Sequence, residues 1–278
     1  MAQDLYRNRD FIPDFDEIIA ETAARSQELA RRVDARTDVA YGTSPRERMD
    51  IIFPPRPAKG APLHVFVHGG YWRSGRKEDH WLVAAPALAA GAVAAMVTYD
   101  LMPGTRLGTI VGQVRAAVRH LVAMAPELGV DAARMTASGH SAGAHLASYL
   151  AAVGPQENVA PELPALRGLL MVSGIYDLAG IPGSFLKNEA KMTTEEAAAW
   201  SPLTSRHLEG PRRIVMLAEG DTAPFHVQGR QLVSLLERNG LDGELRIDAG
   251  LNHLTIVHAL GDPESSCGRG LLELIVGS

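Results

Sequence analysis

Short apolar runs alternate with longer amphipathic segments through most of the chain, and this alternation restricts the fold more than any other feature. The apolar runs, which predict buried strands, are residues 63–67, 93–98, 134–137, 168–172, 213–217 and 244–248. Helical patterns follow at about residues 79–90, 107–124, 142–153, 225–239 and 264–276. Alternating strands and helices predict an α/β fold with a mostly parallel central sheet and helices on both faces.

Three further segments extend this pattern. Residues 14–32 have the periodicity of an amphipathic helix, and the runs 39–41 and 49–53 predict a hairpin that leads into a stiff, proline-rich loop. Residues 177–202 are longer than an ordinary crossover, contain a short predicted helix at 194–200, and would lie above the carboxyl ends of the strands. We therefore expect one domain over residues 1–278, with a small cap formed by the N-terminal helical segment, 1–37, and the 177–202 insertion.

Composition excludes several classes of protein. The 27 lysines and arginines against 32 aspartates and glutamates give a net charge of −5, so no basic excess favours nucleic acid. The single Cys267 cannot form an internal disulfide. The N-terminus lacks the basic start of a signal peptide, and the most apolar stretch, 82–97, is shorter than the ~20 residues of a membrane span. We expect a cytoplasmic protein with no membrane partner; a homodimer is compatible with the sequence, which does not fix the oligomeric state.

Gly139-His140-Ser141-Ala142-Gly143 matches the Gly-x-Ser-x-Gly pattern of a nucleophile elbow. In such an elbow a serine lies at a sharp turn between a strand and a helix, and small flanking residues let the two elements approach. The expected context is present, because a predicted strand precedes the motif and a helix rich in small residues begins at Ala142. Ser141 is the predicted nucleophile.

A serine hydroxyl needs a base to remove its proton, and in folds with this elbow the acid and the histidine follow the serine in the chain. His253 lies in the loop after the last predicted strand. Asp221 follows the strand before it, while Asp177 is a rival acid after an earlier strand. We predict a triad of Ser141, Asp221 and His253, and the alternative role of Asp221 is a helix N-cap.

The oxyanion formed by attack on a carbonyl needs N–H donors, which a glycine-rich loop after an early strand supplies. His68-Gly69-Gly70-Tyr71-Trp72 follows the 63–67 strand directly. We predict that the backbone N–H groups of Gly70, Tyr71 and Ala142 form the oxyanion hole. His68 is expected to shape the loop by hydrogen bonding rather than to act as a base.

Metal and nucleotide sites find no support in the sequence. His64 and His68 are four residues apart but lie in and after a predicted strand, and the sequence has no His-Glu-x-x-His motif or Cys/His cluster. Residues 104–108 match neither the P-loop nor the dinucleotide fingerprint. We expect no metal and no cofactor.

Several motifs together resemble the kynurenine formamidase (arylformamidase) family and its bacterial relatives, in the esterase/lipase branch of the α/β-hydrolases. They are His68-Gly69-Gly70-Tyr71-Trp72, Tyr99-Asp100-Leu101-Met102-Pro103, Gly139 to Leu146, Ser173-Gly174-Ile175-Tyr176-Asp177-Leu178 and Ser201-Pro202-Leu203. The resemblance runs from about Tyr41 to His258. It implies an α/β-hydrolase fold, places the family's triad on Ser141, Asp221 and His253, and makes Asp177 structural.

The resemblance also implies hydrolysis of the N-formyl amide of N-formyl-kynurenine, a small molecule. Candidate substrate contacts are Trp72, Tyr71, His140 and Phe225, although ordinary packing of the aromatic residues is as well supported. The loop at residues 73–77 is basic, and Arg73 or Lys77 is a candidate partner for a substrate carboxylate. A general carboxylesterase that prefers short acyl esters is the alternative enzyme, and an inactive binding protein on the same fold is a third reading.

Overall fold

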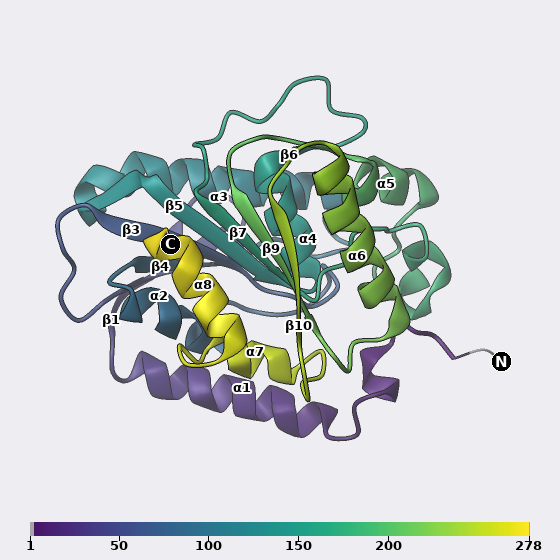
Figure 1. Ribbon diagram of the computed structural model, residues 1–278, viewed down its shortest axis with the longest axis horizontal. Coiled ribbons are helices and arrows are strands. Elements are labelled where there is room, and N and C mark those ends of the chain that lie inside the picture. Colours follow the sequence, from purple (N-terminus) through teal and green to yellow (C-terminus); the bar gives the residue numbers. More distant parts are fainter. Residues whose placement is uncertain (1–2, 278) are drawn as a thin grey trace.

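A single eight-stranded sheet forms the centre of the protein, in a computed structural model that describes residues 3–277 (Figure 1). Its strands, in spatial order, are β1 (Asp34–Ala40), β2 (Arg48–Phe53), β4 (Val93–Val97), β3 (Ala61–Val67), β5 (Val130–His140), β7 (Gly168–Val172), β9 (Arg212–Ala218) and β10 (Gly243–Asp248). β2 pairs antiparallel with β1 and β4, and all other neighbours are parallel. The predicted hairpin and the mostly parallel sheet are confirmed.

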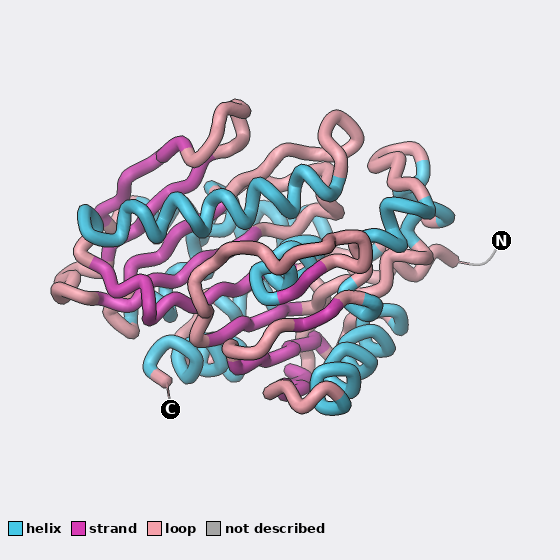
Figure 2. The backbone as a smooth tube through the Cα atoms, turned by 90° about the horizontal axis from the view of Figure 1, so that it is seen from above, coloured by secondary structure: helices cyan, strands magenta, loops and turns pink. Residues whose placement is uncertain are grey.

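Helices cover both faces of this sheet. They are α1 (Phe15–Ala30), α2 (Ala85–Ala89), α3 (Leu107–Leu128), α4 (Ala142–Ser148), α5 (Thr194–Ala199), α6 (Ala223–Arg238), α7 (Thr255–Leu260) and α8 (Ser266–Val276). The longest, α3, runs alongside the strands (Figure 2). Within residues 3–277, no helix is long and apolar enough to cross a membrane.

Alternation along the strands explains the two layers of helices. In β7, Leu169 packs in the core beneath α3 and α4, whereas Leu170 and Val172 pack with α2 and α8 on the opposite face. Side chains of successive strand residues point to opposite faces, so strands buried on both sides read as continuous apolar runs. This is why the strands could be found from the sequence.

Two predicted helices differ from those observed. The 142–153 helix ends at Ser148, and Ala152–Val153 instead forms β6, which pairs antiparallel with β8 (Arg206–His207) in a small second sheet. The 79–90 helix is a 3₁₀ segment, η2 (Glu78–Ala84), followed by α2, which has a proline in its first turn. Proline is favoured there because its missing N–H has no partner in the first turn of a helix.

The N-terminal and C-terminal parts of the chain meet on one side of the molecule. α1 lies beside α7 (Figure 1), and Thr22 Oγ1 is 2.8 Å from Nε2 of His258. α7 was not predicted as a separate helix, although it follows the predicted histidine loop directly. The contact brings the N-terminal segment alongside the loop that carries His253.

Candidate active site

Ser141 lies at the sharp turn between β5 and α4, as its motif predicts. Its backbone has φ 56° and ψ −120°, and its N–H donates to the carbonyl of Val172 at 2.8 Å. A Cβ atom on Gly139 would lie 2.2 Å from the carbonyl oxygen of Gly143, and one on Gly143 would lie 2.0 Å from that of Val67. Both contacts are far inside van der Waals distance, so strand, turn and helix approach this closely because both flanking residues are glycine.

Replacing Gly143 with alanine is expected to lower the free energy of unfolding by about 3 kcal/mol or more, because the new methyl group must displace backbone of β3. Gly112→Ala in α3 is the matched control: nothing lies within 4 Å of its added Cβ, so the better helix propensity of alanine should stabilise the protein by roughly 1 kcal/mol. Urea unfolding of the two variants measures both effects. Equal stability of the variants would contradict the close approach at the elbow.

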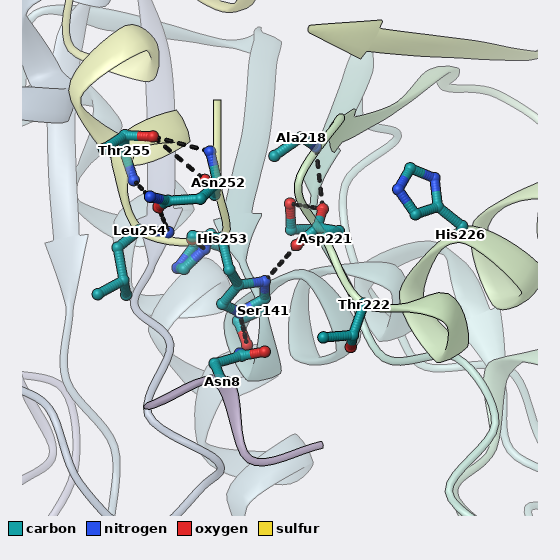
Figure 3. Close-up of polar contacts among 12 residues, drawn as sticks. Asn8, Ser141, Ala218, Asp221, Thr222, His226, Asn252, His253, Leu254 and Thr255 are labelled. Atoms are coloured by element: carbon teal, nitrogen blue, oxygen red, sulfur yellow. Dashed lines mark hydrogen bonds and ion pairs between the residues drawn. The ribbon is translucent and has the colours of Figure 1, made fainter. Parts of the chain in front are cut away.

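The structure brings together the three side chains of the predicted triad (Figure 3). Parallel strands β5, β9 and β10 end at the same edge of the sheet, and Ser141, Asp221 and His253 lie just beyond those ends. His253 Nε2 is 3.0 Å from Ser141 Oγ, and His253 Nδ1 is 2.6 Å from Asp221 Oδ1. Hydrogen-bonded contact of this kind is the arrangement in which a histidine can take a proton from serine.

Asp221 is buried but held in its ionised form. Burial raises the pKa of this carboxyl, but the charge of His253, together with hydrogen bonds from His253, Ser173 and the Ala218 N–H, brings the pKa below its ordinary value. The carboxylate can accept but not donate, so His253 carries its proton on Nδ1 and leaves Nε2 free to accept from Ser141.

Neither alternative for the acid matches the observed contacts. The rival Asp177 accepts the backbone N–H of Ala179 through Oδ1. The N-cap of α6 is Thr222, not Asp221.

The loop predicted to supply the oxyanion hole has an unusual backbone. Gly70, Tyr71 and Trp72 have φ values of 113°, 52° and 58° in succession. A non-glycine residue in this region costs about 1 kcal/mol, so the loop needs other contacts to hold it. A Cβ atom on Gly69 would lie 3.2 Å from Cβ of Ser141, which places the loop directly against the elbow.

The backbone N–H groups of the three predicted donors are not used to hold the loops together. Among the backbone hydrogen bonds between turns, loops and other elements within residues 3–277, none uses the N–H of Gly70, Tyr71 or Ala142. Ala142 belongs to the elbow, and Gly70 and Tyr71 belong to the loop that packs against it. Their use as an oxyanion hole stays a prediction.

His68 shapes this loop and is not placed to act as a base. Its Nδ1–H donates to the carbonyl of Gly69 at 2.7 Å, and its ring stacks on Tyr99 at 4.4 Å. Tyr99 in turn donates its hydroxyl to the carbonyl of His68 at 2.8 Å. Burial lowers the pKa of His68 to about 3, so the ring is neutral at physiological pH.

A cavity of about 570 Å³ opens over Ser141 and His253. Of the predicted substrate contacts, Tyr71 and His140 line it. Trp72 and Phe225 do not, and the prediction that they face substrate is corrected. Trp72 has no exposed surface and donates Nε1–H to His145 Nδ1 at 3.1 Å, and Phe225 packs its ring 4.5 Å from that of His253, behind the cavity wall.

Arg73 and Lys77, the two basic candidates, have different surroundings. Lys77 is buried and pairs through Nζ with Asp38 at 2.8 Å, with Asp50 at 3.2 Å and with Glu78. It is therefore committed to the protein and does not line the cavity. Arg73 does line it, and one of its terminal nitrogens is 2.7 Å from Glu189. Its Nε atom is buried and, within residues 3–277, has no hydrogen-bond partner.

One wall of the cavity comes from the predicted cap, but its individual residues were not predicted. Arg7, Asn8 and Arg9, which precede the first predicted helix, line the cavity together with Phe15, Ile19 and Thr22 of α1. From the 177–202 insertion come Phe185 and Glu189. Both segments of the predicted cap thus reach the site, but the residues before α1 carry no motif that would have singled them out.

Comparisons with known proteins find relatives among formamidases and esterases. The BD-FAE family model matches residues 49–210. The kynurenine formamidase of Danio rerio is 30% identical over 246 residues, covering 86% of this chain and 81% of that protein. A carboxylesterase of Mycobacterium tuberculosis, NlhH, is 32% identical over 121 residues, which cover 43% of this chain and 38% of that protein. Among solved structures, a provisionally assigned thioesterase from Silicibacter sp. tm1040 is 28% identical with a TM-score of 0.82, covering 98% of this chain and 97% of that one.

Proposed function

From its place in the BD-FAE family and among the kynurenine formamidase-like serine hydrolases of the α/β-hydrolase class, to which the chain belongs, we propose an activity for the protein. The proposed activity is that of an arylformamidase, which cleaves the N-formyl amide of N-formyl-kynurenine. The observation that carries the proposal is the cavity itself. The hydrogen-bonded Ser141, His253 and Asp221 open into a space that also presents Arg73, with a buried and unused Nε.

In the proposed mechanism, Ser141 Oγ attacks the formyl carbon while His253 Nε2 takes its proton. The negative charge that develops on the carbonyl oxygen is stabilised by the N–H groups of Gly70, Tyr71 and Ala142. His253 then gives its proton to the leaving arylamine nitrogen as the C–N bond breaks, which leaves a formyl-enzyme. Water, deprotonated by His253, attacks the ester carbon, and His253 returns the proton to Ser141 Oγ as the ester bond breaks and formate leaves. Asp221 holds the imidazole tautomer and stabilises the imidazolium.

Substrate recognition is proposed to use the cationic part of the cavity. Arg73 and Arg7 each place a guanidinium carbon 6.0 Å from the centre of the Phe185 ring, and Tyr71 packs edge-on against the same ring at 5.3 Å. Such a wall can hold an aromatic ring and the carboxylate of an amino-acid tail. The alternative is a general carboxylesterase for short acyl esters, because the same catalytic groups would cleave an ester.

The decisive measurement compares kcat/KM for N-formyl-kynurenine with kcat/KM for a short-chain aryl ester. A formamidase should prefer the formamide. If the formamide is barely hydrolysed while the ester turns over quickly, the formamidase proposal fails and the carboxylesterase takes its place.

Arg73→Gln is expected to raise KM for N-formyl-kynurenine by roughly 10-fold to 100-fold, the worth of a hydrogen bond to a charged group. Formanilide, which has the same scissile bond but no carboxylate, should show little change. Two control variants separate the loss of a contact with the substrate carboxylate from other effects of changing Arg73. Glu189→Gln removes the ion-pair partner of Arg73, and Arg76→Gln removes a neighbouring exposed arginine that pairs with Asp79. Equal effects of Arg73→Gln on both substrates would exclude the carboxylate contact.

We place the protein in the cytoplasm, a proposal that rests on its single cysteine. Cys267 is fully buried in α8 and does not line the cavity over Ser141 and His253. It has no partner of its own kind in the chain, so nothing in the fold depends on an oxidising compartment.

A further inference from the structure

The side chain of Tyr71 links the candidate oxyanion loop to the start of the chain. Residues 4–10, here called the N-terminal strap, pass beside this loop. The Tyr71 hydroxyl donates to the carbonyl of Tyr6 and accepts from Nδ2 of Asn8 at 2.9 Å. Asn8 is 5% exposed and lines the same cavity as Ser141. Figure 3 shows the two side chains beside each other. The phenol is thus bonded in both directions and is not available to substrate.

This link acts on a strained backbone. Gly70, Tyr71 and Trp72 all have positive φ, and a loop of this kind keeps its conformation because surrounding contacts fix it. Trp72 is anchored from one side by its hydrogen bond to His145. Tyr71 is anchored from the other side by the strap. The two predicted donors of the loop, the N–H groups of Gly70 and Tyr71, lie in this anchored stretch.

The strap is itself fastened to the opposite side of the site. Thr222, which follows the candidate acid in the chain, donates its hydroxyl to the carbonyl of Leu5. Gln228 Nε2 donates to the Tyr6 hydroxyl at 3.0 Å, and the ring of Tyr6 packs 6.4 Å from that of Phe225. The strap therefore spans from the loop of the acid to the oxyanion loop.

We propose that Asn8 and the Tyr71 hydroxyl are positioning residues, which hold the Tyr71 and Gly70 N–H groups where the oxyanion forms. The proposal rests on the serine-hydrolase mechanism given above and is independent of which acyl group is the substrate. A tether of this kind stabilises the transition state more than the bound substrate, because the oxyanion develops only during attack. Its loss should lower kcat and leave KM almost unchanged.

The experiment measures Tyr71→Phe and Asn8→Ala with p-nitrophenyl acetate as substrate and phenylboronic acid as inhibitor, because boronate forms a tetrahedral adduct with an active serine. We expect kcat to fall at least 10-fold, KM to stay within about twofold, and boronate affinity to fall by the same factor as kcat. For comparison, removal of a whole oxyanion donor lowers kcat by 10²–10³-fold. Because both variants break one connection, the double variant should be hardly worse than the more damaged single variant.

Tyr41→Phe is the matched control. The Tyr41 hydroxyl is also buried and donates to a backbone carbonyl, that of Thr98, but Tyr41 does not line the cavity. It should keep kcat and boronate affinity despite a similar loss of stability. A folded Tyr71→Phe variant with unchanged kcat and boronate affinity overturns the proposal, and so does an effect on KM alone, which would make the strap merely a wall of the cavity. Failure of the proposed mechanism is separate: the wild-type protein would then neither hydrolyse the ester nor be labelled at Ser141 by a fluorophosphonate.

Discussion

Replacing Ser141 with alanine is expected to lower kcat by about 10⁶-fold, the loss typical of a serine-hydrolase nucleophile. The alanine variant keeps the φ of 56° at the elbow and the N–H bond to Val172, so its fold should not change. What disappears is the Oγ atom 3.0 Å from His253 Nε2, and with it the covalent intermediate. Single-turnover kinetics and fluorophosphonate labelling measure this directly. Residual catalysis of 10³–10⁴-fold over water would come from the oxyanion donors and substrate binding.

Ser148→Ala is the matched control for this result. Ser148 lies on the same helix, α4, is 1% exposed, and donates its hydroxyl to the carbonyl of His145 at 2.6 Å. Removing this hydroxyl measures how much stability is lost with a buried hydrogen bond, because Ser148 does not line the cavity. It should retain kcat, whereas a folded Ser141→Ala variant with substantial turnover would show that the nucleophile is another residue.

The candidate triad could be predicted from sequence because its residues are placed by the order of elements. Parallel strands put the ends of β5, β9 and β10 at one edge, so residues that follow these strands meet there whatever the intervening sequence. The elbow adds a local signal, since Gly139 and Gly143 lie where any Cβ would collide with backbone. Buried strands, as apolar runs, and tight turns, as glycines at fixed positions, can therefore be recognised in a single sequence.

Side-chain direction in the oxyanion loop could not be predicted in the same way. Tyr71 and Trp72 are adjacent and aromatic, and both were candidate substrate contacts. Their positive φ values belong to a tight turn in which Tyr71 lines the cavity while Trp72 enters the core against His145. No periodicity of strand or helix applies to such a turn. Lys77 was misjudged for a related reason, because its partner Asp38 lies 39 residues away.

The contacts of the N-terminal strap to the site were not predicted, because they join residues that are far apart in the sequence. Asn8 bonds Tyr71 across 63 residues, and Leu5 bonds Thr222 across 217. The residues of the strap have neither helical periodicity nor a turn motif that points to a site. The sequence therefore predicts the catalytic edge of the sheet far better than the segments that fold over it.

Acidification from pH 7 to pH 5 is expected to lower the free energy of unfolding by several kcal/mol, because buried histidines are held neutral in the folded state. Burial lowers the pKa of His64 and His68 to about 3 and that of His145 and His207 to about 4. The unfolded chain has pKa values near 6.5 and so binds more protons below that pH. The stabilisation is complete above about pH 6.5 and is lost as the pH falls towards the folded pKa values, by roughly 2 kcal/mol per histidine at pH 5.

The surroundings of His64 show why these rings stay neutral and how the prediction can be tested. His64 is a residue of β3, and its ring bonds two hydroxyl groups of β5, Thr136 Oγ1 at 2.9 Å and Ser138 Oγ at 2.8 Å. These groups bond a neutral ring without stabilising a charge. His64→Gln should reduce the slope of unfolding free energy against pH, measured with urea between pH 6 and 5, by about 1.4 kcal/mol per pH unit.

The carboxyl group of Asp221 does not contribute in this pH window. Its pKa is lowered in the folded protein, so the stability that it provides is lost only below its unfolded pKa of 3.8. An unfolding free energy that is flat from pH 7 to 5 would contradict the neutral buried histidines.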